Sequence, residues 1–131
     1  MEEKYEGRMI QQREYVQVYA NGYGTINLLF EDEKPKAIAV GQKMNEINEL
    51  AYMNGYNWDA FFNYYLARHA PDILESIDPD PEAGSYLAYF EETPENEEKA
   101  LRFADIIVSL IENPEEIYQI IRDHADDIEW D

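Results

Sequence analysis

The segment Asp78-Pro79-Asp80-Pro81-Glu82 is the stretch of the chain that comes closest to a cofactor site. Its alternating acidic oxygens are similar to the first ligand positions of a calcium-binding loop. An EF-hand loop counted from Asp78 needs glycine at its sixth position and glutamate at its twelfth. The chain has Ala83 and Tyr89 there. We therefore interpret the segment as a stiff, solvated connection between a helix and a strand, and keep weak divalent-cation binding as an alternative.

A second candidate is the acidic run over residues 91–98, which places five carboxylates in eight residues. Acids at a helix N-terminus are stabilising, and this accounts for any one of them. It does not account for a net charge of −19, because repulsion on that scale destabilises a compact chain. We therefore predict recognition of a basic partner, in which acids speed association and tyrosines supply contact area. The predicted partner-binding residues are Asp78, Asp80, Glu82, Tyr86, Tyr89, Glu91, Glu92, Glu95, Glu97 and Glu98.

The tyrosines in that set cannot all face a partner. Side chains alternate along a β-strand, so Tyr86 and Tyr89 lie on opposite faces and at most one of them faces solvent. The sequence does not say which one. Four of the 11 tyrosines are expected at the half-buried edge of the core: Tyr52, Tyr64, Tyr65 and Tyr118.

Signals of catalysis are weak in this chain. His69 and His124 each come near the predicted end of a helix, where the helix dipole favours a charged imidazole, so we assign both a structural role. No glycine-rich phosphate loop follows a strand, and no serine lies in a nucleophile-elbow pattern. The absence of cysteine excludes thiol catalysis, disulfides and cysteine-ligated metals. We predict a protein that is not an enzyme and needs no metal or cofactor.

The charge is unevenly distributed along the 131 residues. Residues 72–131 hold 19 acidic and three basic side chains, whereas residues 1–71 are nearly balanced. With 45% hydrophobic residues, the chain is expected to fold as a single domain over residues 1–131 with one acidic face. Such a field repels phosphate backbones and anionic lipid, so direct binding to nucleic acid or to a membrane is not expected.

The start of the chain suggests a location. Met1-Glu2-Glu3-Lys4-Tyr5-Glu6 lacks a basic region followed by an apolar run, and no stretch of the chain approaches ~18 consecutive apolar residues. We expect a cytoplasmic protein.

The first elements that must position these residues are a hairpin and a helix. Residues 15–19 and 25–30 are rich in β-branched and aromatic types and flank a glycine-containing turn, which predicts an antiparallel hairpin. From Pro35, apolar residues recur at intervals of three and four through Ala51, which predicts a helix that Asn54-Gly55 ends.

Three further helices and one strand are predicted after it. Asn57 is expected to cap a helix that runs to Pro71, followed by a helical turn over residues 73–77 and a strand over residues 85–90. Thr93-Pro94 predicts the start of another helix, and Asn113-Pro114 the start of the last. The order ββααβαα places about four helices against a small antiparallel sheet, an α+β fold.

Four segments together resemble a known family: Met53-Asn54-Gly55-Tyr56-Asn57-Trp58, His69-Ala70-Pro71-Asp72, Asp80-Pro81-Glu82-Ala83-Gly84, and Ile111-Glu112-Asn113-Pro114-Glu115 with the later Glu129-Trp130-Asp131. In order and spacing they resemble the immunity-protein family numbered fifty-one of bacterial polymorphic toxin systems. The likeness covers roughly residues 35–131 and is weak over the N-terminal hairpin. It implies a small cytosolic protein that binds and neutralises a cognate toxin domain, and it transfers no binding residues to this chain.

The predicted function is therefore a non-enzymatic inhibitor that forms a one-to-one complex with a toxin domain of basic surface. Its acidic face would guide a steric block of the toxin's active site. Two alternatives remain. One is a nucleic-acid mimic of the anti-restriction kind, with acids spaced like a phosphate ladder, and the other is the weak divalent-cation binder.

Overall fold

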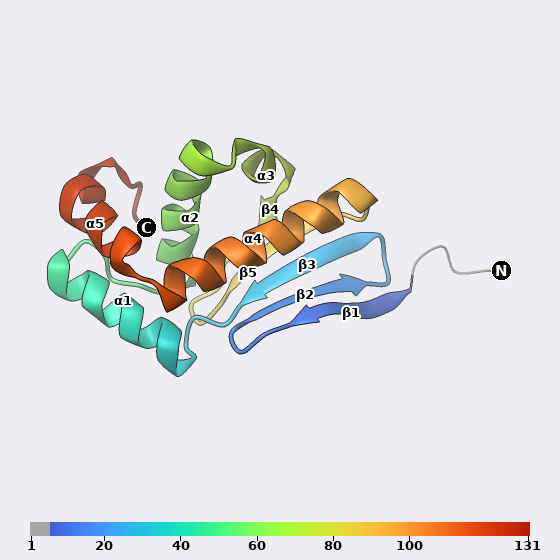
Figure 1. Cartoon of the computed structure of the whole chain (residues 1–131), viewed down its shortest axis with the longest axis horizontal. Helices are drawn as coiled ribbons and strands as arrows, with labels where there is room; N and C mark the ends of the chain where they lie inside the picture. The colour runs from blue at the N-terminus through green and yellow to red at the C-terminus, as the bar shows by residue number, and fades with distance from the viewer. Residues whose placement is uncertain (1–5) are drawn as a thin grey trace.

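The structure, a computed structural model, is built on one antiparallel sheet beside a group of helices (Figure 1). It describes residues 6–131, so the expectation drawn from the first five residues lies outside the described part. The sheet has the order β1-β2-β3-β5-β4, with strands β1 (Gly7–Gln12), β2 (Val16–Asn21), β3 (Thr25–Phe30), β4 (Asp78–Pro79) and β5 (Tyr86–Glu91). The helices are α1 (Pro35–Ile47), α2 (Gly55–His69), α3 (Pro71–Ser76), α4 (Pro94–Glu112) and α5 (Glu115–His124), followed by a 3₁₀ turn at Ala125–Asp127. No helix in residues 6–131 is long and apolar enough to cross a bilayer.

One face of the sheet packs against the helices and forms one side of the apolar core. Val18, Leu28 and Ala88, from three neighbouring strands, are fully buried on it. Helix α4 packs on β2, β3 and β5, while α1, α2 and α5 gather at one end of the molecule (Figure 1). Trp58 of α2 meets Phe30 of β3 edge to face, with ring centroids 5.1 Å apart. Helices packed on an antiparallel sheet confirm the predicted α+β class.

The predicted hairpin is confirmed as β2 and β3, and the predicted third strand as β5. Strands β1 and β4 are additional. Strand β1 contains a β-bulge between Met9 and Gln11, which breaks the two-residue alternation by which strands are recognised. Strand β4 is two residues long and gives no periodic signal.

Two helix boundaries differ from the prediction at asparagines. Asn54-Gly55 does not end a helix. Instead the Asn54 side chain caps α2 by accepting the Asn57 N–H at 2.9 Å, and α1 already ends at Ile47. Asn113 caps the end of α4 rather than the start of α5, whereas Thr93 and Pro94 begin α4 as predicted. Asparagine is favoured both at the start and at the end of a helix, so an asparagine in the sequence does not show by itself which of the two it marks.

The tyrosines expected at the core edge are mostly found there. Tyr65 is buried, and Tyr64 and Tyr118 are half-buried against the core. The expectation was wrong for Tyr52, which is 69% exposed. Helix α1 ends four residues before the predicted Ala51, so Tyr52 lies in the loop to α2 and leaves the helical face that would have buried it.

The start of α2 is a junction of three distant segments. The Gly55 N–H donates to the Ala83 carbonyl at 3.1 Å, and the Asn57 Oδ1 accepts the Asp131 N–H at 2.7 Å. The Trp130 Nε1 donates to the Ala125 carbonyl at 3.0 Å, and Ile128 is buried. Segments around residues 55, 83 and 130 therefore meet at this junction, where they hold the fold together.

Candidate functional site: the open face of the sheet

The side of the sheet opposite the core carries a row of side chains that crosses all five strands. Residues paired across strands share a face. The strand register joins Met9, Tyr19, Asn27, Tyr89 and Asp78 in one continuous row. A second row joins Gln12, Gln17, Leu29 and Leu87. We call the surface formed by these two rows the open face.

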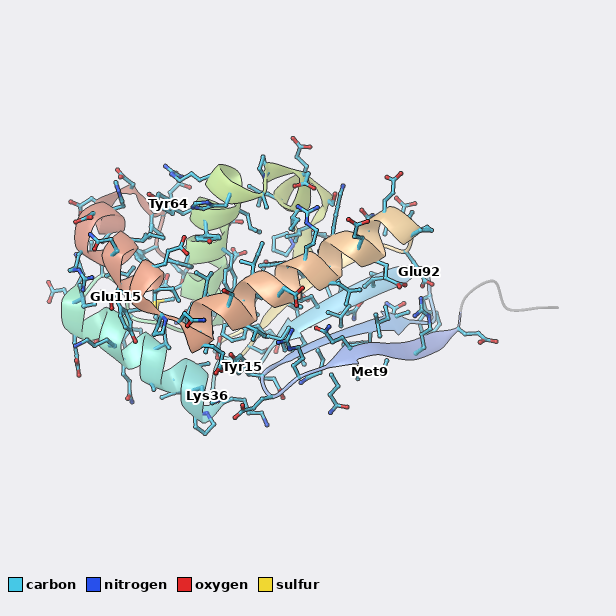
Figure 2. All side chains as sticks on the ribbon, in the orientation of Figure 1. Met9, Tyr15, Lys36, Tyr64, Glu92 and Glu115 are labelled. Atoms are coloured by element: carbon cyan, nitrogen blue, oxygen red, sulfur yellow. The ribbon has the colours of Figure 1, made fainter. Side chains whose placement is uncertain are left out.

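The open face is aromatic and aliphatic, yet it lies outside the core. Tyr19, Leu29, Leu87 and Tyr89 are half-buried by their strand neighbours, and none of them belongs to the core cluster. Met9, on the edge strand β1, is 53% exposed (Figure 2). Large apolar side chains on an uncovered sheet face are typical of an interaction surface.

Polar contacts fix the middle of the first row. The Asn27 Nδ2 donates to the Tyr19 hydroxyl at 3.2 Å, and the Tyr89 hydroxyl donates to Asp80 Oδ2 at 3.1 Å. Partial burial and the Asp80 carboxylate raise the pKa of Tyr89. Asn27 is buried, and its Oδ1 has no partner in residues 6–131. A buried acceptor without a partner costs free energy.

A pocket of about 660 Å³ lies at one end of the open face. Asn27 and Tyr89 line it, together with three carboxylates from α3, β4 and β5: Glu75, Asp78 and Glu91. In the described part of the chain no basic side chain lines it, although Lys99 donates at 2.9 Å to the hydroxyl of Ser76, which does line it. The pocket therefore offers hydrogen-bond acceptors and negative charge.

Most of the lysines and arginines in residues 6–131 pair with acids that lie outside the open face. Six basic side chains form ion pairs: Arg8 with Glu97, Arg13 with Asp105, Lys36 with Glu14 and Glu112, Lys43 with Glu46, Arg102 with Asp72, and Arg122 with Glu115. Figure 2 shows Lys36 beside Tyr15, whose hydroxyl also donates to Glu112 at 2.8 Å. Five acids at the border of the open face, which we call the border acids, make no ion pair within residues 6–131: Glu31, Glu75, Asp78, Asp80 and Glu91.

The sheet divides the predicted binding residues into two groups. Asp78, Asp80 and Glu91 belong to the open face, and Glu82 follows in the bridge to Ser85. Glu95, Glu97 and Glu98 lie on α4, on the helix side. Glu97 meets Arg8, whose strand partner Ala20 is in the core face. Glu92 lies at the turn into α4 (Figure 2).

The structure decides between the two tyrosines. Tyr86 is 1% exposed and packs edge to face against Phe62 in the core, so it does not reach a partner. Of these two tyrosines, Tyr89 lies on the open face. The same two-residue alternation, applied to residues 15–30, would also have pointed to Tyr19, Asn27 and Leu29, which the sequence prediction missed.

His69 and His124 end α2 and α5, as predicted. His69 stacks on Tyr65 with centroids 4.2 Å apart, and His124 Nδ1 lies 3.1 Å from Asp127. Across residues 6–131, no three histidine or acidic side chains converge closely enough to hold a metal ion. The open face thus presents rings, aliphatic groups and acids that form no ion pair within residues 6–131.

Comparisons with known proteins give one match. The family model described as immunity protein 51 matches residues 16–126. The matched range begins with β2 and ends within the 3₁₀ turn, so it includes most of the open face and leaves out β1. No curated protein and no solved structure matches the chain.

Proposed function

The chain belongs to the immunity protein 51 family, and from that premise we propose that it binds and neutralises a cognate bacterial toxin domain, with the open face as its contact surface. The complex is one-to-one, and it blocks the toxin's active site sterically. The protein acts as an inhibitor and not as an enzyme.

One observation carries the choice of surface: the open face combines apolar and aromatic side chains with acids that form no ion pair within residues 6–131. Interfaces draw most of their energy from a few aromatic anchors, and Tyr19 and Tyr89, which flank Asn27 in the first row, are the candidates here. The border acids supply the steering. They favour a partner with a basic surface, because complementary charge raises the association rate.

The test is binding kinetics between the full chain and the toxin domain encoded beside its gene. Tyr89→Ala should raise the dissociation rate about 30-fold or more, the effect of losing an anchor worth at least ~2 kcal/mol. The matched control is Tyr56→Ala on α2, which removes the same ring from a site that is 41% exposed and outside both rows of the open face. Equal dissociation rates for the two variants would reject the open face as the interface.

The steering role of the border acids has a separate test. Neutralising Asp78 and Glu91 together should lower the association rate and flatten its dependence on salt between ~50 and ~200 mM, because border charges act mainly on encounter. Neutralising Asp123 and Asp126, which lie on α5 and the 3₁₀ turn, changes the net charge equally and should have a smaller effect. If both double variants lower the association rate equally, the total charge and not the position of the border acids determines that rate.

The two alternative functions predict different results in binding experiments. A nucleic-acid mimic would bind several unrelated DNA-binding proteins with affinities close to that for the toxin. A divalent-cation binder would give saturable heat in a calcium titration of the free protein. Specific binding to one toxin domain, with no heat from calcium, is the result that supports the proposal.

A further inference from the structure

Asp32 is a buried carboxyl group without a partner. It lies between β3 and α1 and is 6% exposed. Its Oδ2 is fully buried and accepts no hydrogen bond from residues 6–131. Lys34 is two positions away in the sequence, yet no ion pair joins it to Asp32. Buried carboxylates are normally paired or hydrogen-bonded, so this one needs an explanation.

The carboxyl group lines a pocket of about 230 Å³ between α1 and the loop that leads to α2. Two aromatic residues, Tyr52 and Trp58, form part of the wall, and Met53 adds apolar surface. Gln42 and Asn45 of α1 also line the pocket, so side-chain amide oxygens are available there. The Asn45 Nδ2 is engaged with the Glu49 carbonyl at 3.2 Å, which leaves the Asn45 oxygen free as an acceptor.

The lining is one-sided in charge but not in hydrogen bonding, because the Gln42 amide can also donate. A carboxylate and amide oxygens accept hydrogen bonds, and aromatic faces attract cations. Among residues 6–131, no basic side chain lines the pocket, so no cation in its wall pairs with Asp32. The apolar wall suits an alkyl chain, because long cationic side chains bury their stems along apolar surface.

We propose that this pocket binds a primary ammonium group on an alkyl stem, which is the chemistry of a lysine side chain or of a free alkylamine. The ammonium pairs with the Asp32 carboxylate, and the stem lies along Met53 and Trp58. The site is separate from the open face and does not depend on the proposed function.

The direct test is an NMR titration of the isotope-labelled full chain with n-butylammonium chloride at pH 8. The shifts of the Trp58 indole and of the Gln42 and Asn45 amide groups should saturate. Asp32→Asn should weaken binding at least tenfold, as expected for loss of a charge-assisted hydrogen bond. Glu33→Gln removes the same charge from the neighbouring exposed position and should change binding less than twofold.

Two further arms make the result specific. n-Butanol has the same stem without the charge and should not compete. Tyr52→Ala, at a side chain that is 69% exposed and thus tolerant of change, should weaken binding several-fold and keeps the test available if Asp32→Asn does not fold. The proposal is overturned if n-butanol binds as well, if both acid variants act alike, or if no saturable shift occurs and the pocket holds water only.

The source of the amine is distinguished by repeating the acid variants against the toxin domain. A tenfold loss of toxin affinity in Asp32→Asn, but not in Glu33→Gln, assigns the pocket to a lysine of the toxin. Unchanged toxin affinity with retained n-butylammonium binding assigns it to a free alkylamine. Failure of the chain to bind any toxin would reject the proposed function and leave the n-butylammonium result standing.

Discussion

Asp32 makes the stability of this protein depend on pH near neutrality. Burial, with a smaller contribution from Glu33, raises the pKa of its carboxyl group from the usual 3.8 to about 7. A raised pKa means that the folded state favours the protonated form. The free energy of unfolding should therefore fall as pH rises between about 4 and 7, and level off above.

Asp32→Asn should remove this dependence. Relative to the wild type, the variant should gain stability from pH 5 to pH 7 by up to about 1.4 kcal/mol per pH unit. Urea unfolding at pH 5, 6, 7 and 8 measures the difference, with Glu33→Gln as the control. A constant difference between the wild type and Asp32→Asn over this range would show that Asp32 is ionised throughout.

Other single residues show how far sequence reasoning reaches. Alternation along a strand separates Tyr86 from Tyr89, but only the side on which α4 packs decides which one is buried. The isolation of Asp32 could not be predicted, since it depends on the pocket formed with residues of α1 and α2.

At the scale of elements, the junction at the start of α2 depends on a residue without a side chain. A Cβ at Gly55 would lie 1.7 Å from the Glu82 carbonyl oxygen and 2.2 Å from that of Ser85. Both are backbone atoms, so relief requires movement of the loop between β4 and β5. Gly55→Ala should therefore cost about 3 kcal/mol or more.

Gly41→Ala is the matched control for this substitution. Gly41 lies inside α1, and its Cβ would meet the Met53 side chain at 3.1 Å. The gain in helix propensity, about 1 kcal/mol, opposes this contact, so the net change should stay within about 1 kcal/mol of zero. Thermal or urea unfolding of both variants provides the comparison, and equal costs would contradict the junction as described.

The segment after α5 should contribute to stability in the same way. Ile128 is 5% exposed, and its truncation to alanine should cost about 2–5 kcal/mol. The neighbouring Glu129 is exposed, so Glu129→Ala should change the unfolding free energy by less than ~0.5 kcal/mol. A cost for Ile128→Ala close to that of the control would mean that the segment is not docked in solution.

The elements themselves were predictable where local signals are strong. Thr93-Pro94 marks the start of α4, where the Thr93 hydroxyl accepts the Asn96 N–H at 3.0 Å. The cap of α2 was predicted at Asn57, three residues after the actual cap Asn54. The contact between the Gly55 N–H and the Ala83 carbonyl, 28 residues away, was not predictable. Contacts of this kind leave no periodic trace in the sequence.

For the whole molecule, the net charge of −19 predicts a specific response to salt. Screening weakens both the repulsion among acids and the attraction within exposed ion pairs, and the repulsion dominates in a chain with 29 acidic and 10 basic residues. The urea midpoint should therefore rise between ~20 and ~300 mM sodium chloride. A falling midpoint would show that the ion pairs contribute more than the repulsion.

The sequence predicted that the candidate site would be acidic, but not which face of the fold would carry it. The acids near residues 78–98 pointed to recognition of a basic partner, which remains a prediction. The sheet separates these acids into two groups, since Asp78 and Glu91 border the open face and Glu97 faces Arg8 on the helix side. Only the order of the strands, which includes β1 and β4, gives this division.

The edges of the sheet affect how the protein behaves when it is concentrated. An uncovered sheet with apolar side chains invites self-assembly if its border strands can pair with those of another copy. At one border, β4 has two residues, one of which is Pro79 and has no N–H to donate. At the other border, β1 is interrupted by its bulge. Neither border is a good template for strand addition, so the unbound chain should stay monomeric at concentrations at which flat-edged sheets of similar apolar surface form aggregates.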